Sequence, residues 1–186
     1  AQNIIFGSSL NGDEPGLGKT IQSIASVIAL GAFPCLVICP SSLKLNWQRE
    51  WQKFTDKRAM VLDDKTKNTW HQYYNVGMVD VFITNYDSLK KFFVLSMPPK
   101  KKVGSREIRP HSKDFVMRDV INLFTSVVVD ESHRCKNDGT LTSKLTLRIT
   151  NKKKHGGALS GTPVINKPAD LWPQLAIINK LHLFGG

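Results

Sequence analysis

The residues best suited to chemistry lie near the start of the chain, in the run Gly16-Leu17-Gly18-Lys19-Thr20. Glycine-rich turns expose backbone N–H groups, a lysine ammonium group reaches the β- and γ-phosphates of a nucleotide, and a threonine hydroxyl is a ligand for Mg²⁺. All three parts occur here in the order of a phosphate-binding loop. The run therefore predicts a site for ATP and Mg²⁺, with Thr20 on the metal. The predicted cofactor-binding residues are Gly16, Leu17, Gly18, Lys19, Thr20 and Ile21.

The sequence around this loop fits the prediction with one departure. The strict phosphate-loop pattern has glycine at position 13, where this chain has Asp13, and Gly12 comes one residue too early. An apolar stretch at 3–6 precedes the loop, and apolar residues at helical spacing follow it. A helix that begins at Lys19 would direct the positive end of its dipole towards phosphate. The alternative is a glycine-rich turn before an ordinary helix. That alternative does not explain why Lys19 and Thr20 occupy the lysine and threonine positions of the phosphate-loop pattern.

A second candidate is the acidic pair Asp130-Glu131, which follows the β-branched run at 126–129. Such a run is typical of a buried parallel strand, and side chains at its carboxyl end face the ligand crevice of an α/β sheet. Asp130 would bind Mg²⁺ directly or through water, and Glu131 would orient and deprotonate the attacking water. Without the phosphate loop, the pair would be read as a solvated turn or a helix N-cap. His133 either couples the nucleotide to a third motif at 160–163 or fills a turn.

Alternating strands and helices must position these residues. The order of apolar runs and helical periodicities predicts a parallel α/β sheet whose loops gather at its carboxyl edge. After the phosphate loop and its helix, strands are expected at 35–39, 59–62, 80–84, 126–129 and 157–160. Further helices are expected at 43–54, 66–75, 86–95, 114–123, 140–149 and 168–179.

Six stretches together resemble the first RecA-like lobe of a superfamily-two helicase, in its Swi/Snf-type double-stranded DNA translocase branch. The six stretches are 13–20, 37–43, 47–51, 83–89, 129–137 and 159–163. The Asp-Glu-Ser-His box, residues 40–43 and the tail at 167–172 are most similar to the annealing-helicase subgroup and its bacterial or phage relatives. The resemblance implies a RecA-like P-loop NTPase lobe with a mostly parallel sheet flanked by helices.

The resemblance also implies residues that contact DNA and residues that couple the two sites. The implied DNA contacts are Pro40, Ser41, Ser42, Asn85, Tyr86, Arg134, Lys136 and Asn137. Hydroxyl and backbone N–H groups in such loops meet DNA phosphates, although each of these residues could also be an ordinary surface loop residue. Coupling between the nucleotide and the DNA path is implied for His133, Ser160, Gly161 and Thr162.

A motor of this family has parts that are not found in this chain. The family carries an upstream segment with an adenine-reading glutamine, and a second RecA-like lobe that supplies an arginine finger. The phosphate loop begins about a dozen residues from Ala1, so residues 1–186 are expected to be a single lobe, truncated at both ends. Because an arginine supplied in trans is worth about a thousandfold or more in rate, the isolated lobe should bind ATP but hydrolyse it poorly.

The charge of the chain favours a polyanionic partner. It contains 26 Lys and Arg against 15 Asp and Glu, a net charge of +11. Residues 90–118 hold nine basic and two acidic residues, and are expected to form an exposed basic loop or short hairpin between motif strands. This insert either grips a DNA backbone or is simply solvated. A second basic cluster at 148–157 is expected to be a solvated turn.

Other features narrow the class of protein. No apolar run approaches the ~18 residues of a membrane span and no signal peptide is found, so an intracellular protein is expected, in a bacterial cytoplasm or a nucleus. Three cysteines, an odd number, do not suggest a disulfide framework. Trp47 and Trp51 lie four residues apart on one expected helix, which favours packing over base stacking.

The sequence therefore favours an ATPase lobe that couples Mg-ATP to movement along double-stranded DNA, together with a second lobe. A strand-separating DNA or RNA helicase and the motor subunit of a restriction system would share the same ATP site. A nucleotide-gated DNA-binding module without turnover is a third alternative, from a different class of protein.

Overall fold

The fold is taken from a computed structural model in which residues 7–14, 16–99, 101–103, 106–108, 110–163 and 170–180 are described. For 101–103 and 106–108 the description is of the backbone. The apolar stretch at 3–6, expected before the phosphate loop, lies outside these residues, as does the start of the helix expected at 168–179.

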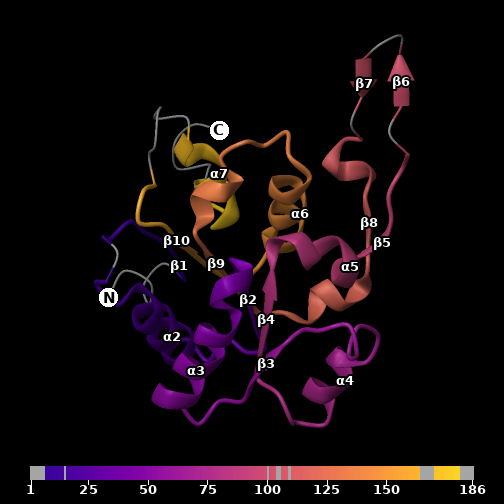
Figure 1. Cartoon of the computed structure of the whole chain (residues 1–186). Coiled ribbons are helices and arrows are strands. Elements are labelled where there is room, and N and C mark those ends of the chain that lie inside the picture. Colours follow the sequence, from indigo (N-terminus) through magenta and orange to yellow (C-terminus); the bar gives the residue numbers. More distant parts are fainter. Residues whose placement is uncertain are drawn as a thin grey trace.

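Among the described residues, six parallel strands form the central sheet (Figure 1). They are β1 (Ser8–Asn11), β2 (Cys35–Cys39), β3 (Ala59–Val61), β4 (Val81–Asn85), β9 (Ser126–Asp130) and β10 (His155–Leu159). Their order in space is β1-β10-β9-β2-β4-β3, and every neighbouring pair is parallel. The strands therefore all end at one edge of the sheet, with helices in the crossover connections. The expected α/β fold is confirmed.

Helices cover both faces of the sheet because the buried side chains of its central strands point alternately to the two faces. On β2, Val37 packs towards α2 (Lys19–Ala29) and α3 (Lys44–Phe54), whereas Leu36 and Ile38 pack into the core on the other face. Three helices cover that other face, with Trp70 of α4 (Trp70–Asn75) in the same core. They are α5 (Leu89–Phe93), α6 (Leu141–Thr150) and α7 (Leu171–Ile177), and Figure 1 shows α6 and α7 lying away from α2 and α3.

Two of the predicted helices are shorter than expected. The helix expected at 66–75 begins only at Trp70, because the Asp63 carboxylate accepts hydrogen bonds from the N–H and hydroxyl of Thr66 and holds a turn there. The helix expected at 86–95 consists of the 3₁₀ turn η2 (Tyr86–Ser88) followed by α5, after which the chain enters β5 (Val94–Ser96).

The helix predicted at 114–123 is wrong. The chain there forms the short strand β8 (Val116–Met117), which pairs antiparallel with β5, and then the 3₁₀ segment η4 (Asp119–Leu123). Phe115 and Phe124 at the two ends are both buried, and Phe124 stacks on Trp70 with ring centroids 5.6 Å apart. Burial of both phenylalanines against the rest of the core outweighs the local helix propensity.

The basic insert holds a second antiparallel pair, β6 (Lys101–Val103) with β7 (Arg106–Ile108). Figure 1 shows these two strands projecting away from the sheet, beyond β5 and β8. Of the two forms expected for this segment, a loop or a short hairpin, the structure has the hairpin.

The solvated turn predicted for the basic cluster at 148–157 is wrong for two residues, Arg148 and Lys153, which bind other parts of the chain. Arg148 donates to the Phe115 carbonyl oxygen at 3.4 Å, and Lys153 Nζ donates to the Ile121 carbonyl oxygen. Partial burial lowers the pKa of Lys153. Arg148, near the end of α6, and Lys153, just before β10, therefore both bind the segment at 115–121 that precedes β9.

The three cysteines are free thiols inside the fold. Burial raises the pKa of Cys35 and of Cys39 to about 12, and that of Cys135 to about 11. They are therefore protonated and unreactive at neutral pH in the folded chain.

Within the described ranges, no helix is both long enough and apolar enough to cross a membrane.

Candidate nucleotide site

The phosphate loop connects β1 to α2. Gly16 and Gly18 have φ of 90° and 74°, left-handed values that side chains with a Cβ rarely adopt. Gly18 is the N-cap of α2 and contributes no side-chain cap, so the first N–H groups of the helix keep their bonding capacity for a ligand. Lys19 Nζ donates to the carbonyl oxygens of Asp13 at 2.7 Å and Glu14 at 2.9 Å. The loop backbone therefore already surrounds the ammonium group.

Two residues that the sequence analysis missed organise this loop. Asn11, at the end of β1, donates its amide N–H to Gln22 Oε1 at 2.7 Å and accepts the Asp13 N–H at 2.9 Å. The Gln22 amide in turn donates to the Leu17 carbonyl oxygen at 3.0 Å and to the Asp13 carboxylate at 3.3 Å. Asp13, at the position where the strict pattern has glycine, is thus part of the loop's own network. Gln22 could have been found from its position four residues after Gly18, which places it over the loop.

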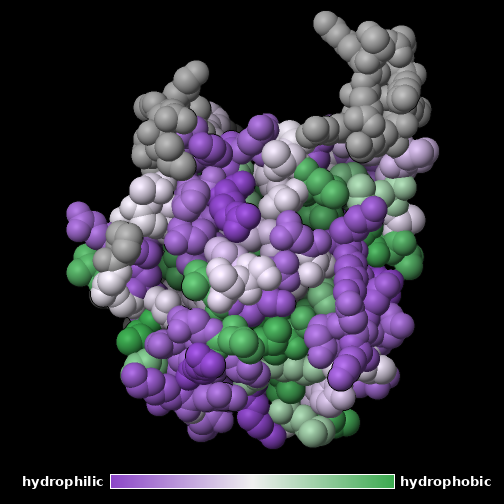
Figure 2. Space-filling view, viewed as in Figure 1, coloured by the Kyte–Doolittle hydropathy of each residue, from purple (hydrophilic) through white to green (hydrophobic). Residues whose placement is uncertain are grey.

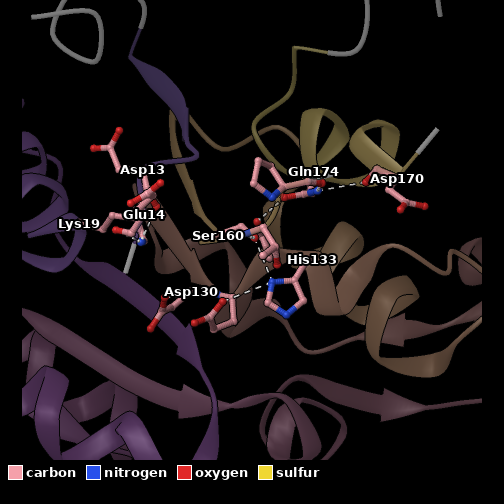
Figure 3. A network of polar contacts seen from close by, with 12 residues as sticks. Asp13, Glu14, Lys19, Asp130, His133, Ser160, Asp170 and Gln174 are labelled. Atoms are coloured by element: carbon pink, nitrogen blue, oxygen red, sulfur yellow. Dashed lines mark hydrogen bonds and ion pairs between the residues drawn. The ribbon is translucent and has the colours of Figure 1, made fainter. Parts of the chain in front are cut away.

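Asp130 ends β9 with its side chain on the sheet face covered by α2 and α3. Its Oδ1 accepts the Glu131 N–H at 3.0 Å, and its Oδ2 accepts the indole N–H of Trp47 at 2.9 Å. Burial raises the pKa of Asp130, and the Glu131 charge adds to this, whereas the Trp47 hydrogen bond and the Lys19 charge oppose it. Figure 3 shows that the loop lysine and the strand carboxylate lie at one site.

Glu131 adopts a left-handed backbone, with φ 54° and ψ 48°. For a residue with a Cβ this conformation costs of order 1–3 kcal/mol and is typical of functional sites. The side chain is 38% exposed, and its Oε2 lies 3.3 Å from Nδ1 of His133. The turn thus holds the carboxylate at the surface of the site, open to water, while the Asp130 carboxylate next to it is buried.

The second and third motifs meet through His133 and Ser160. Nδ1 of His133 lies 2.9 Å from Oγ of Ser160, and Ser160 Oγ accepts the Thr162 N–H at 3.1 Å. A chain of polar contacts therefore runs from Glu131 through His133 to Ser160 and Thr162. Figure 3 shows its central contact, between His133 and Ser160. The structure brings together His133, Ser160 and Thr162, which were expected to couple the sites, with Gly161 between the last two.

Gln174 on α7 is a third residue that the sequence analysis missed. It is fully buried, its Oε1 accepts the Ser132 hydroxyl at 2.8 Å, and its amide N–H donates to the Pro163 carbonyl oxygen at 2.5 Å. One side chain therefore ties the loop after β9 to the loop after β10. Ser132 and Gln174 are 42 residues apart in sequence, so no local pattern reveals the pair.

The residues expected at DNA lie at the carboxyl ends of β2, β4 and β9, with Asn85 as the last residue of β4 and the others in the loops that follow these strands. Ser41, Ser42, Arg134, Lys136 and Asn137 are exposed, Pro40 is half-buried, and Asn85 and Tyr86 are buried. The exposed members can reach a ligand at this edge of the sheet with their side chains.

The buried pair has a different role in the folded chain. The Tyr86 hydroxyl donates to the Asp130 carbonyl oxygen at 2.5 Å, and the Arg134 guanidinium lies over the Tyr86 ring, 5.3 Å from its centroid. Asn85 Oδ1 accepts the Ser88 hydroxyl at 2.9 Å. Contact of Tyr86 with DNA would therefore involve its backbone. Its side chain connects the turn after β4 to the backbone of Asp130.

A basic groove of about 470 Å³ lies just beyond the carboxyl end of β4. Its polar lining includes four cations and one carboxylate: Lys67, Lys90, Lys91, Arg118 and Asp87. Figure 2 shows hydrophilic surface over α4 and α5, the helices beside this groove. The groove has the charge expected of a surface that meets a polyanion.

The oxygen donors of Asp130 and Thr20 suit a Mg²⁺ ion that is bound together with nucleotide phosphates, rather than a metal ion bound by protein side chains alone. In the part of the chain that the structure describes, no group of three or more His, Cys, Asp and Glu side chains is placed to hold a metal ion. Mg²⁺ in nucleotide sites is typically held by one or two protein oxygens, water and the phosphates. The Asp130 carboxylate, held by two donors, would supply one such oxygen, and Thr20 in the first turn of α2 would supply a hydroxyl.

This fold and site define a RecA-like lobe of the type found in superfamily-two helicases. The chain belongs to the SNF2-related domain family, whose profile matches residues 6–184. The resemblance inferred from the sequence motifs is confirmed.

Curated relatives come from animals, yeast, a plant and a bacterium. The chain is 26% identical over 185 residues to the SWI/SNF-related matrix-associated actin-dependent regulator of chromatin subfamily A-like protein 1 of Xenopus tropicalis, covering 96% of this chain and 17% of that protein. It is 30% identical over 187 residues to the nuclear protein STH1/NPS1 of Saccharomyces cerevisiae, covering 94% and 12%. It is 29% identical over 180 residues to the human DNA annealing helicase and endonuclease ZRANB3, covering 92% and 15%. The chain thus spans between 12% and 17% of the length of these relatives.

Solved structures give the same class. The SWI2/SNF2 ATPase core of Sulfolobus solfataricus, in complex with double-stranded DNA, matches with a TM-score of 0.67 and 29% identity, covering 96% of this chain and 33% of that one. The helicase domain of Pyrococcus furiosus Hef matches with a TM-score of 0.58 at 14% identity, covering 97% of this chain and 34% of that one, and supports the fold.

Proposed function

We propose that this chain is the ATP-binding lobe of a DNA-dependent ATPase that translocates along double-stranded DNA. The observation that carries the proposal is the meeting of three motifs at one edge of the sheet: Lys19, the Asp130-Glu131 pair, and the His133–Ser160 contact at 2.9 Å. Residues expected at DNA follow strands that end at the same edge.

Each residue has a distinct part in the proposed reaction. The N–H groups at the start of α2 and the Lys19 ammonium group bind the phosphates and stabilise the charge that develops during transfer. Glu131 orients the attacking water and takes its proton, for which its partly exposed, left-handed position is suited. Mg²⁺, when bound by Asp130 and Thr20, supplies further neutralisation of phosphate charge.

A second RecA-like lobe in the same parent protein is part of the proposal. The relatives are about six to eight times longer than the stretch that this chain matches, and the matched archaeal ATPase core is three times longer. An arginine from a second lobe would raise the hydrolysis rate about a thousandfold or more. This lobe alone is accordingly expected to bind ATP and to turn it over very slowly.

The first prediction is stimulation by duplex DNA. Phosphate release by the full-length protein should rise at least about tenfold with double-stranded DNA, because DNA bound across both lobes would align them for catalysis. The measurement compares double-stranded DNA, single-stranded DNA and RNA at equal nucleotide concentration and fixed salt. Stimulation by single strands or RNA alone would favour a strand-separating helicase instead. ATP-dependent DNA affinity without phosphate release would favour a non-catalytic module.

The second prediction concerns coupling. Ser160 is fully buried, and its hydroxyl is shared by His133 and the Thr162 N–H, so Ser160→Ala breaks the contact between the second and third motifs. ATP affinity should stay within about twofold, while stimulation by DNA should fall about tenfold, the effect of losing roughly 1.4 kcal/mol of coupling. The measurement is phosphate release with and without duplex DNA.

A matched serine variant controls for loss of a buried hydroxyl. Ser126 is also buried, and its hydroxyl donates to the Ala32 carbonyl oxygen at 2.7 Å at the start of β9, away from both the second and the third motif. Ser126→Ala should leave the ratio of stimulated to basal turnover unchanged. An equal loss of stimulation in both variants would contradict a coupling role for Ser160.

A further inference from the structure

Trp47 makes a hydrogen bond that packing alone does not require. Its indole N–H donates to Oδ2 of Asp130 at 2.9 Å, although the two residues are 83 positions apart. Trp47 is 1% exposed and Asp130 9% exposed, so water does not compete for this bond. A buried carboxylate oxygen in an apolar core needs such a donor.

The geometry of the sheet explains why this tryptophan reaches that carboxylate. Along β9, Val128 packs with Trp47 in the core beneath α2 and α3, and the alternation of the strand places Asp130 on the same face. Lys44 begins α3 just after β2, the neighbour of β9 in the sheet, so the first turns of α3 lie beside the end of β9.

We propose that Trp47 is a positioning residue for the metal: its N–H fixes the Asp130 carboxylate in the orientation that binds Mg²⁺. The proposal rests on the proposed function, in which Asp130 is a ligand of Mg-ATP. Asp130 Oδ1 accepts the Glu131 N–H at 3.0 Å and Oδ2 accepts Trp47. Since each carboxylate oxygen has two lone pairs, both oxygens keep one for a metal.

This arrangement resembles the outer shell of other metal sites. The terminal torsion of an aspartate is soft, so a carboxylate held by a single backbone N–H is free to turn. A donor on the second oxygen removes that freedom. Loss of an outer-shell partner of this kind typically weakens metal affinity about 10–100-fold.

The chain offers a matched control on the same helix. Trp51 is fully buried one turn after Trp47, and its indole N–H has no hydrogen-bond partner in the described part of the chain. Trp47→Phe and Trp51→Phe therefore remove the same atoms from the same core. Only Trp47→Phe removes a donor to Asp130.

The experiment measures binding of fluorescent ADP to the full-length protein as a function of Mg²⁺ concentration, and again in excess chelator. Trp47→Phe should raise the Mg²⁺ concentration at half-saturation about tenfold or more. Its affinity for ADP without metal should match that of the wild type, because the phosphate loop is untouched. Trp51→Phe should match the wild type in both measurements.

Two results would overturn the proposal. One is the same Mg²⁺ midpoint for Trp47→Phe and Trp51→Phe. The other is a loss of ADP affinity in chelator for Trp47→Phe, including complete loss through misfolding, while Trp51→Phe binds normally, because Trp47 would then be needed for the fold. Failure of the proposed function itself would appear separately, as a wild-type protein that binds no nucleotide or binds it without regard to Mg²⁺.

Discussion

Lys19→Ala is expected to weaken ATP binding at least about 100-fold in the full-length protein. A lysine that contacts phosphate makes charge-assisted hydrogen bonds worth about 1.5–3 kcal/mol each, so two such contacts correspond to about 3–6 kcal/mol. The same side chain also donates to the carbonyl oxygens of Asp13 and Glu14, at 2.7 and 2.9 Å, and so holds the loop. Titration with a fluorescent ATP analogue measures the loss directly.

Two further variants separate the effects of charge and geometry. Lys154 is exposed beside the start of β10, at the opposite edge of the sheet, so Lys154→Ala removes one positive charge without touching the site. It should bind ATP as the wild type does. Lys19→Arg keeps the charge but replaces a compact ammonium with a planar fork, and should also bind weakly. ATP affinity within threefold of wild type in Lys19→Ala would contradict the phosphate-binding role of this lysine.

The local sequence pattern predicts an element correctly where consecutive side chains all face the same environment. The strand predicted at 35–39 matches β2 at both ends, because β2 lies between β9 and β4 and all five residues are buried. A continuous apolar run between two turn signals is the expected sequence of such a strand. The loop at 16–20 was likewise found because its glycines, lysine and threonine are adjacent in the chain.

Prediction failed where contacts between distant segments decide the structure. The segment at 114–123 is not an α-helix because Phe115 and Phe124 are both buried and β8 pairs with β5. The packing role predicted for Trp47 is confirmed by its burial, yet its bond to Asp130 joins residues 83 positions apart and leaves no local signal. The same holds for Gln174, whose partners lie in two different loops. Residues predicted to contact ligand can be recognised in the sequence, whereas the residues that hold them in place are recognised only in the fold.

Glu131→Gln is expected to keep ATP binding and to lower phosphate release about 100–10,000-fold, the usual contribution of a general base. Glutamine has the same shape and still fits beside Nδ1 of His133, so the left-handed turn and the contact with Ser160 should persist. What it lacks is a basic carboxylate, because an amide oxygen accepts a hydrogen bond but does not take the proton of the attacking water. The measurement is single-turnover hydrolysis in the presence of duplex DNA, together with ATP affinity.

A second carboxylate beside the loop makes this test specific for the base. Glu14 is exposed and contributes its backbone carbonyl, which holds Lys19, so Glu14→Gln removes a nearby negative charge and leaves that contact in place. If turnover depends on the net charge of the site, both variants should change it by a similar factor. If Glu131 is the base, only Glu131→Gln stops hydrolysis, and it does so with ATP bound. Retained turnover in Glu131→Gln would transfer the role of base to another group, such as His133, whose Nδ1 lies 3.3 Å from Oε2 of Glu131.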